Sequence, residues 1–364
     1  MKKQRLIGID LCRGFAAYAV VLLHSGDKTW GSVSDSAKEL SSFFIFAVPF
    51  FLATSFYFTV GKSSIKLSSD FWKSRFQRII VPYITWTLVY LAIKIPIFYL
   101  FQQSNKLDKL LDDPMGIIFL GGASVQLYFL PILIAGTFAI TFLEYFNKTI
   151  KLNKLALLSV LSIGLNQLLV LSGNSYSLAD KIAFKSLLDL IAANANDNPV
   201  LRLLLVNISW IIRCLPYIFT GMLLKQLIPY LQSTKWNKML HNIIPTLSLT
   251  MFLIFAIWGR LLIPSSLNSF IIAYLLLLFG IYYLGHQNNP IAKNLGLCSY
   301  GIYLIHTFFV QVFKLVIAKI NPSWITQVSV VSLLLYSVSI FLISWLTVLL
   351  MMKNKTIAKY MFGA

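Results

Sequence analysis

The sequence predicts an all-α integral membrane protein with about ten transmembrane helices in one bundle. Hydrophobic residues make up 58% of the 364 residues and charged residues only 12%, whereas a soluble domain carries about 25% charged residues. The mean hydropathy is +0.76, and apolar runs recur from one end of the chain to the other without a polar block between them. This composition excludes an ordinary soluble domain, so the lipid bilayer is the first partner that we expect.

Ten apolar stretches are long enough to cross a bilayer as helices, which takes about 17 to 25 residues. We expect these spans at 7–24, 43–60, 80–101, 126–143, 152–171, 205–224, 243–263, 268–284, 297–318 and 326–351. The stretch 116–122 is too short to cross and is expected to be re-entrant or interfacial. We assign residues 1–352 to one membrane domain and residues 353–364 to a short basic tail.

The distribution of basic residues predicts how the chain is oriented. If alternate loops share one side, the loops on the side of the N-terminus carry 18 Lys and Arg residues and the opposite loops carry 10. Because cytosolic loops are enriched in these residues, we expect a multi-pass protein of the cell membrane with both termini in the cytosol. Lys2 and Lys3 resemble the start of a signal peptide, but Asp10 and Arg13 interrupt the apolar run that follows. The first span is therefore expected to stay uncleaved.

The net charge of +19 does not indicate a nucleic-acid partner, because the 31 basic residues are scattered between apolar spans rather than gathered among stacking aromatic residues. Cys12, Cys214 and Cys298 lie in three different spans without the spacing of metal ligands. We expect buried thiols, no disulfide framework and no metal site. The chain also lacks a Gly-rich phosphate loop, a nucleophile elbow and a zinc-binding His-Glu-x-x-His pair.

Three ionisable residues share the first span, where an Arg near the bilayer centre costs at least about 3 kcal/mol. Arg13 and His24 are eleven residues apart, close to three turns at about 3.6 residues per turn, and Asp10 lies one turn before Arg13. All three therefore lie on one stripe of a helix. The stripe is either a functional surface or an ion pair at a helix end with an interfacial His. In the predicted orientation, Arg13 lies toward the cytosol and His24 near the opposite surface.

A second group of basic residues precedes the third span. Arg75 and Arg78 are three residues apart and would share one face of an α-helix, and Pro82 suits the first turn of the span that follows. The pair either anchors a cytosolic loop to anionic lipid or clamps the phosphates of a cytosolic ligand, because paired guanidinium groups match phosphate geometry.

Other polar residues lie inside later spans. Arg213, in the sixth span, is expected to face a partner or a wet cavity. Ser299, Tyr303 and His306 recur at helical spacing and form one polar stripe on the ninth span. His306 is either a helix–helix hydrogen bonder, which its mid-membrane depth favours, or a catalytic residue. Tyr128 and Phe129 are expected in an interfacial aromatic belt.

Taken together, these motifs resemble the membrane-bound acyltransferase family 3, the O-acyltransferases of bacterial surface glycans. The resemblance rests on Asp10-x-x-Arg13-Gly14 followed by His24, Phe50-Phe51, Arg75-x-x-Arg78 before Pro82, Leu127-Tyr128-Phe129-Leu130 and Ser299-Tyr300-x-x-Tyr303-Leu304-x-His306. These blocks occur in the order that the family shows and extend over nearly the whole chain.

The resemblance implies transfer of an acyl group, most simply acetyl, from cytosolic acyl-CoA to a hydroxyl of a surface or exported glycan, or of a lipid-linked saccharide. The implied catalytic residues are His24, Asp10, Arg13 and His306, and the implied coenzyme-binding residues are Arg75, Arg78 and Arg213. His24 would act as general base, a role that suits an imidazole, or would carry the acyl group as a transient acyl-His. The alternative is a multi-span transporter or flippase whose intramembrane cations line an anion path, although no inverted repeat is apparent.

Overall fold

The computed structural model describes residues 5–26, 30–61, 69–147, 150–173, 198–232, 237–283, 285, 288–322 and 326–364. Lys2 and Lys3, which the orientation prediction uses, lie outside these ranges. Within the described ranges, ten helices are long and apolar enough to cross a membrane, and each overlaps one of the ten predicted spans. The predicted all-α class with about ten spans is therefore confirmed.

The described chain forms two compact units. Unit 1 consists of Met1–Thr54 and Leu231–Lys355, and unit 2 consists of Ser55–Tyr230 and Thr356–Ala364. The predicted site residues are divided between them: unit 1 holds Asp10, Arg13, His24 and His306, and unit 2 holds Arg75, Arg78 and Arg213. Each unit therefore contributes a different part of the predicted chemistry.

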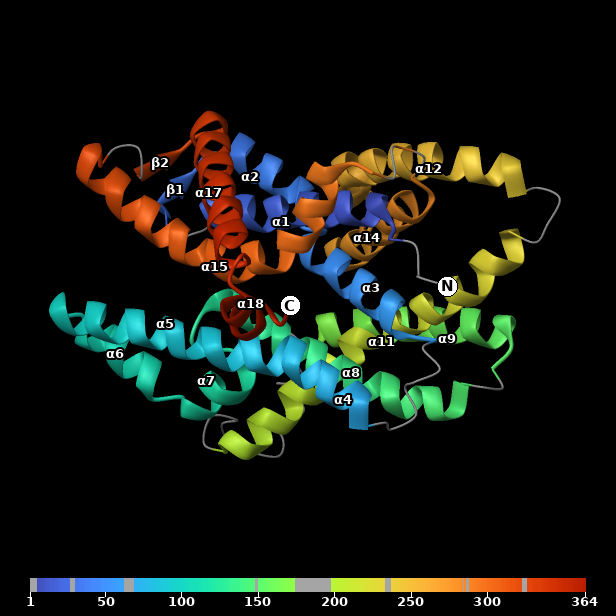
Figure 1. Ribbon diagram of the computed structural model, residues 1–364, viewed down its shortest axis with the longest axis horizontal. Helices are drawn as coiled ribbons and strands as arrows, with labels where there is room; N and C mark the ends of the chain where they lie inside the picture. Colours follow the sequence, from blue (N-terminus) through green and yellow to red (C-terminus); the bar gives the residue numbers. More distant parts are fainter. Residues whose placement is uncertain are drawn as a thin grey trace. The chain divides into compact units, whose positions relative to one another are not determined.

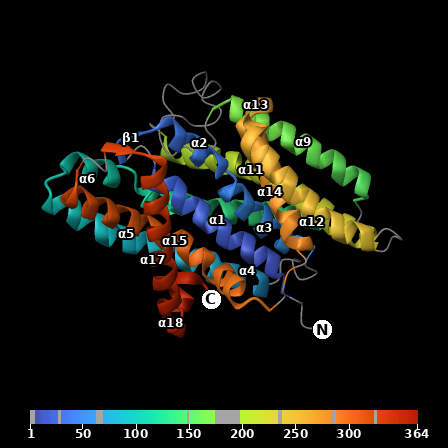
Figure 2. The same cartoon turned by 90° about the horizontal axis from the view of Figure 1, so that it is seen from above.

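Unit 1 is built around its first helix. Helix α1 (Ile7–Ser25) packs against α14 (Ser265–Tyr282), α15 (Pro290–Ile320) and α17 (Val330–Met351), as Figure 1 shows. The other elements of this unit are β1 (Ser32–Val33), α2 (Asp35–Phe43), the start of α3 (Ala47–Thr59), α12 (Asn237–Ile254), a π-helical turn (Phe255–Gly259), α13 (Arg260–Leu262) and β2 (Gln327–Val328). Figure 2 shows α12 and α14 side by side.

Small residues let α1 approach its neighbours closely. A Cβ atom on Gly8 would collide with the carbonyl oxygen of Gly280 in α14. On the α15 side, a Cβ atom on Gly296 would collide with the carboxylate of Asp10. Glycine is therefore required at both contacts, where it allows close helix packing and leaves room for a buried charge.

A short parallel pair of strands joins the segment after α1 to the segment before α17. Ser32 is opposite Gln327 and Val33 is opposite Val328 (Figure 1). The Ser32 hydroxyl also donates to the carbonyl oxygen of Thr326 at 2.7 Å. These bonds link the segment after α1 to a segment about three hundred residues later in the chain.

Unit 2 begins with one long, interrupted helix. Helix α4 (Ser69–Arg75), a π-helical turn (Phe76–Ile80) and α5 (Val81–Leu100) follow one another without a break, and Pro82 lies in the first turn of α5 as predicted. The other elements are α6 (Ser104–Leu111), α7 (Pro114–Leu120), a 3₁₀ turn (Val125–Tyr128), α8 (Phe129–Asn147), α9 (Leu152–Leu171), most of α11 (Pro199–Gln232) and most of α18 (Lys355–Phe362). Figure 1 shows α5 and α6 side by side.

The stretch predicted to be too short to cross forms α7 and a tight turn. The turn requires Gly121, whose φ of 81° lies in the left-handed region. The Tyr83 hydroxyl accepts from the Gly121 amide at 3.0 Å and donates to the Ile118 carbonyl oxygen at 2.9 Å. Lys94 donates to the Ala123 carbonyl oxygen at 2.8 Å. Side chains of α5 therefore hold the non-helical backbone in place.

Much of the predicted basic tail is helical. Helix α18 lies against α5, where Trp86 donates to the Met361 carbonyl oxygen at 2.8 Å and its ring lies 6.4 Å from the ring of Phe362. The boundaries that we predicted, a membrane domain over 1–352 and a tail over 353–364, remain a proposal.

Candidate functional site

Two histidines from opposite ends of the sequence lie next to each other in unit 1. His24 is in the last turn of α1 and half-buried, and His306 is in α15 and fully buried. The centres of their imidazole rings are 5.2 Å apart, with the planes inclined at 40°. Of the two interpretations left open for His306, this contact favours a role at the site.

The hydrogen bonding of His306 identifies its tautomer. Its Nδ1 atom is 2.7 Å from the carbonyl oxygen of Tyr303, one turn earlier in the same helix. Because a carbonyl oxygen only accepts, Nδ1 carries the proton and Nε2 has the lone pair. No described residue hydrogen-bonds to this buried Nε2 atom. The Nδ1 bond stays within α15, and among the described residues no hydrogen bond joins His306 to another helix, so Nε2 remains an acceptor beside His24.

Two further aromatic rings extend the histidine pair. The Tyr303 ring lies 5.9 Å from that of His306 and 5.9 Å from that of Phe51 in α3. Phe51 and Tyr303 are both buried. The motifs of the first, second and ninth spans therefore meet at one place in unit 1, and the rings limit the motion of the imidazoles.

Trp30 holds the end of α1, and sequence reasoning missed it. Its indole Nε1 donates to the backbone carbonyl oxygen of His24 at 3.1 Å, and its ring stacks on Tyr336 of α17 at 5.1 Å with 17° between the planes. The last carbonyl groups of a helix lack intrahelical donors, so this bond satisfies one of them and fixes the turn that carries His24. The signal in the sequence that could have identified it is a Trp only six residues after His24, directly after the first span.

At the other end of α1, Asp10 forms its ion pair with Arg5, which precedes the helix. Arg5 also donates to the Lys293 carbonyl oxygen at 3.2 Å. Arg13 is half-buried and lies within electrostatic range of both Asp10 and Arg5. One of the two interpretations left open for this stripe is an ion pair at a helix end, and the structure shows such a pair between Asp10 and Arg5, which lies two residues before α1.

The predicted basic pair of unit 2 is split by a change of helix type. Arg75 ends α4, where its guanidinium donates to the Thr59 hydroxyl and lies 5.5 Å from the centre of the Phe71 ring. Arg78 lies in the π-helical turn and is exposed. The two guanidinium groups stay within electrostatic range of each other. They therefore form one positive patch, although their surroundings differ.

Arg213 lies in α11, within electrostatic range of the phenol groups of Tyr128 and Tyr217. Of the partner or wet cavity expected for Arg213, the structure shows neighbouring phenol groups. The aromatic-belt interpretation is wrong for Phe129, which is 3% exposed and belongs to the core of unit 2. Tyr128 is half-buried beside Arg213, because the 3₁₀ turn before α8 directs it inward.

A metal site would need several ligating side chains close together in the described part of the chain. Among the described residues, no three His, Cys, Asp or Glu side chains gather in a way that could hold a metal ion. Cys12, Cys214 and Cys298 are free thiols and buried, as the sequence predicts. What the arrangement offers chemically is a pair of imidazoles for proton transfer in unit 1 and a set of cations for binding an anion in unit 2.

The comparisons with known proteins bear on this arrangement. A family model described as an acyltransferase domain matches residues 6–349. That range includes both histidines and all five of the other residues that the sequence singled out for the site. No curated protein and no solved structure matches the chain.

Proposed function

Since the chain belongs to the acyltransferase 3 family, we propose that it transfers an acyl group, most simply acetyl, from cytosolic acyl-CoA to a hydroxyl of a surface or exported glycan. Membership of the family makes the chain a membrane acyltransferase, and this replaces the transporter interpretation that its intramembrane cations had left open. The observation that carries the proposal is the contact between His24 and His306 in unit 1.

His24 is the general base in this proposal. It removes the proton from the acceptor hydroxyl, the hydroxyl oxygen attacks the thioester carbonyl carbon, and the carbon–sulfur bond breaks. The proton then passes from the imidazolium to the departing thiolate, so that coenzyme A leaves as a thiol. His306 is a positioning residue, because its ring is fixed by Tyr303 and lies against that of His24.

The basic residues hold the donor. Arg75 and Arg78 bind the coenzyme phosphates, since guanidinium groups form charge-assisted, bidentate hydrogen bonds with phosphate. Arg213 and Arg13 guide the rest of the donor toward the acceptor. The role of Asp10 is to keep Arg13 in place, since Asp10 is buried, pairs with Arg5 and lies within electrostatic range of Arg13.

We also propose that both termini face the cytosol. The excess of Lys and Arg in alternate loops and the ten candidate spans support this orientation. A reporter fused after Ala364 tests it, because it should be active only in a form that works in the cytosol. Periplasmic activity would require an odd number of crossings and would contradict the orientation.

The proposed reaction is tested with membranes that contain the protein and radiolabelled acetyl-CoA. Label should enter the glycan fraction with the wild type and not with His24→Ala, at equal amounts of membrane-inserted protein. Equal incorporation by the two proteins would refute His24 as the base. If the wild type transferred label from none of a series of acetyl-, propionyl- and longer acyl-CoA donors, the donor assignment would be refuted.

A further inference from the structure

A pocket in unit 2 borders the proposed donor site, because Arg75 lines it, but the proposed reaction gives no role to the other residues that line it. It lies between the α4 segment with its π-helical turn and helix α8, and its volume is about 430 Å³. Ligand pockets in proteins are typically about 300 to 1,000 Å³. The indole of Trp72 and the ring of Phe138, 4.6 Å apart, form one wall.

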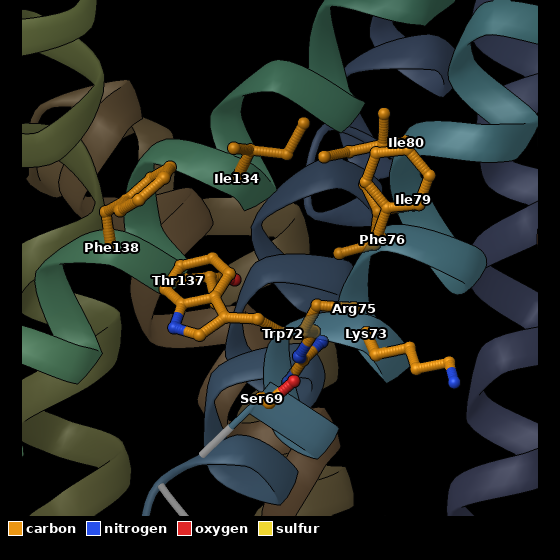
Figure 3. Close-up of a pocket in the computed structure, with 10 residues that line it drawn as sticks. All are labelled: Ser69, Trp72, Lys73, Arg75, Phe76, Ile79, Ile80, Ile134, Thr137 and Phe138. Atoms are coloured by element: carbon orange, nitrogen blue, oxygen red, sulfur yellow. The ribbon is translucent and has the colours of Figure 1, made fainter. Parts of the chain in front are cut away.

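The two ends of the pocket differ in polarity. Figure 3 shows the side chains of Ser69, Lys73 and Arg75 on one side and those of Ile134 and Ile80 on the opposite side. The bond between Arg75 and Thr59 keeps one cation beside the polar end. A ligand that fills this space therefore needs a negative charge at one end and an apolar chain at the other.

The pocket opens on a surface that suits lipid. Phe76 and Phe138, which line it, are 50% and 57% exposed. Both belong to helices that are candidate membrane spans by length and composition, Ser69–Leu100 and Val125–Leu143, and Phe76 lies just before the predicted start of the third span at residue 80, so this exposed apolar surface suits contact with lipid. An amphiphile can therefore enter the pocket sideways from the membrane.

The apolar end does not suit the coenzyme. An adenine base needs hydrogen-bonding partners for its polar edge, whereas this end of the pocket is formed by isoleucine and phenylalanine side chains. Thr137 is the polar residue of the α8 wall, and its hydroxyl already donates to the carbonyl oxygen of Leu133 at 2.6 Å. An alkyl chain, by contrast, needs no hydrogen bonds.

We propose that this pocket binds an anionic glycerophospholipid from the surrounding membrane. The phosphate of its headgroup contacts Lys73 and Ser69, beside the positive charge of Arg75. One acyl chain runs past Trp72 toward Ile134. Juxtamembrane basic residues attract anionic lipids, and the pocket adds a defined place for one chain.

Bromine-labelled lipids test the proposal, because bromine quenches the fluorescence of a tryptophan that it contacts. The protein is placed in phosphatidylcholine nanodiscs that contain a fixed fraction of either phosphatidylglycerol or phosphatidylcholine with a dibrominated acyl chain. The chain has eight tryptophans, so the signal of Trp72 is the difference between the wild type and Trp72→Phe. Brominated phosphatidylglycerol should quench this difference signal at least about twice as strongly as brominated phosphatidylcholine.

Two variants distinguish lipid binding in the pocket from a general attraction of anionic lipid to the positively charged protein. Lys73→Gln should weaken the binding of phosphatidylglycerol about fivefold, the equivalent of one basic residue near a membrane surface, and so bring its quenching toward that of brominated phosphatidylcholine. Lys151→Gln, which removes an exposed charge just before α9, should leave the preference unchanged. An unchanged preference in Lys73→Gln would overturn the headgroup assignment.

Two further outcomes would overturn the proposal as a whole. The first is equal quenching of Trp72 by the two brominated lipids, which would mean that the pocket does not select an anionic headgroup. The second is relief of the quenching by saturating acetyl-CoA, which would assign the pocket to the acyl donor. Neither outcome depends on transferase activity, so a failure of the proposed reaction would not be mistaken for either.

Discussion

In unit 1 the imidazole of His306 is wholly buried and tied to Tyr303, whereas in unit 2 the guanidinium of Arg78 is exposed on a π-helical turn. The first arrangement suits proton transfer, which needs groups held in a fixed geometry. The second suits binding of a mobile, highly charged ligand. The difference predicts that substitutions in unit 1 lower kcat and that substitutions of the basic pair in unit 2 raise KM for the donor.

The largest effect is expected from His24→Ala. Loss of the general base should lower kcat by a factor of about 10² to 10⁴, because positioned acid–base catalysis contributes that much to a rate. The measurement is initial-rate kinetics in membranes adjusted to equal protein levels. A near-normal kcat in this variant would show that unit 1 does not catalyse proton transfer. The proposed division between catalysis in unit 1 and donor binding in unit 2 would then fail.

His306→Ala should lower kcat by a factor of about 10 to 100 while KM for acetyl-CoA changes little, because His306 positions His24 and does not bind the donor. The pH–rate profile should also change shape, since the electrostatic surroundings of His24 change. His306→Gln, which keeps a hydrogen-bonding side chain, should recover part of the rate. A loss of membrane-inserted protein with normal kcat per molecule would instead show a purely structural role.

The double variant Arg75→Ala/Arg78→Ala tests whether unit 2 binds the acyl donor. KM for the acyl donor should rise about tenfold or more, because a hydrogen bond to a charged group is worth about 1.5 to 3 kcal/mol. The kcat at saturating donor should stay within a factor of about two. Replacement by Lys at both positions should restore KM only in part, because Lys keeps the charge but lacks the bidentate fork. Unchanged donor dependence in the Ala variant would reduce the pair to a membrane anchor.

The smallest effect is expected from Trp30→Phe. This change removes the indole donor to the His24 carbonyl oxygen but keeps an aromatic ring to stack on Tyr336. A typical hydrogen bond contributes about 0.5 to 1.5 kcal/mol, so kcat should fall by a factor of about 2 to 10. Thermal stability in detergent is the control, and an unchanged kcat at lower stability would show that Trp30 supports the fold without orienting His24.

Much of the fold could be predicted from the sequence, because the bilayer imposes a simple rule on composition. A helix that crosses hydrocarbon needs a long apolar run, and all ten runs coincide with long helices in the described structure. The same rule identified 116–122 as too short to cross, and α7 has seven residues. The positions of Pro82 and the buried cysteines also followed from local chemistry.

Sequence reasoning could place His24 and His306 on helices, but only the tertiary structure decided that they meet. Periodicity states which residues share a face of one helix, and it contains no information about which helix lies opposite that face. The ion pair of Asp10 with Arg5 and the bond from Trp30 to His24 join residues only five and six positions apart, but Arg5 and Trp30 lie beyond the ends of α1, where helical periodicity does not say which way a side chain points. The site of unit 1 is made by contacts between segments that are far apart in the chain, and such contacts are a property of packing.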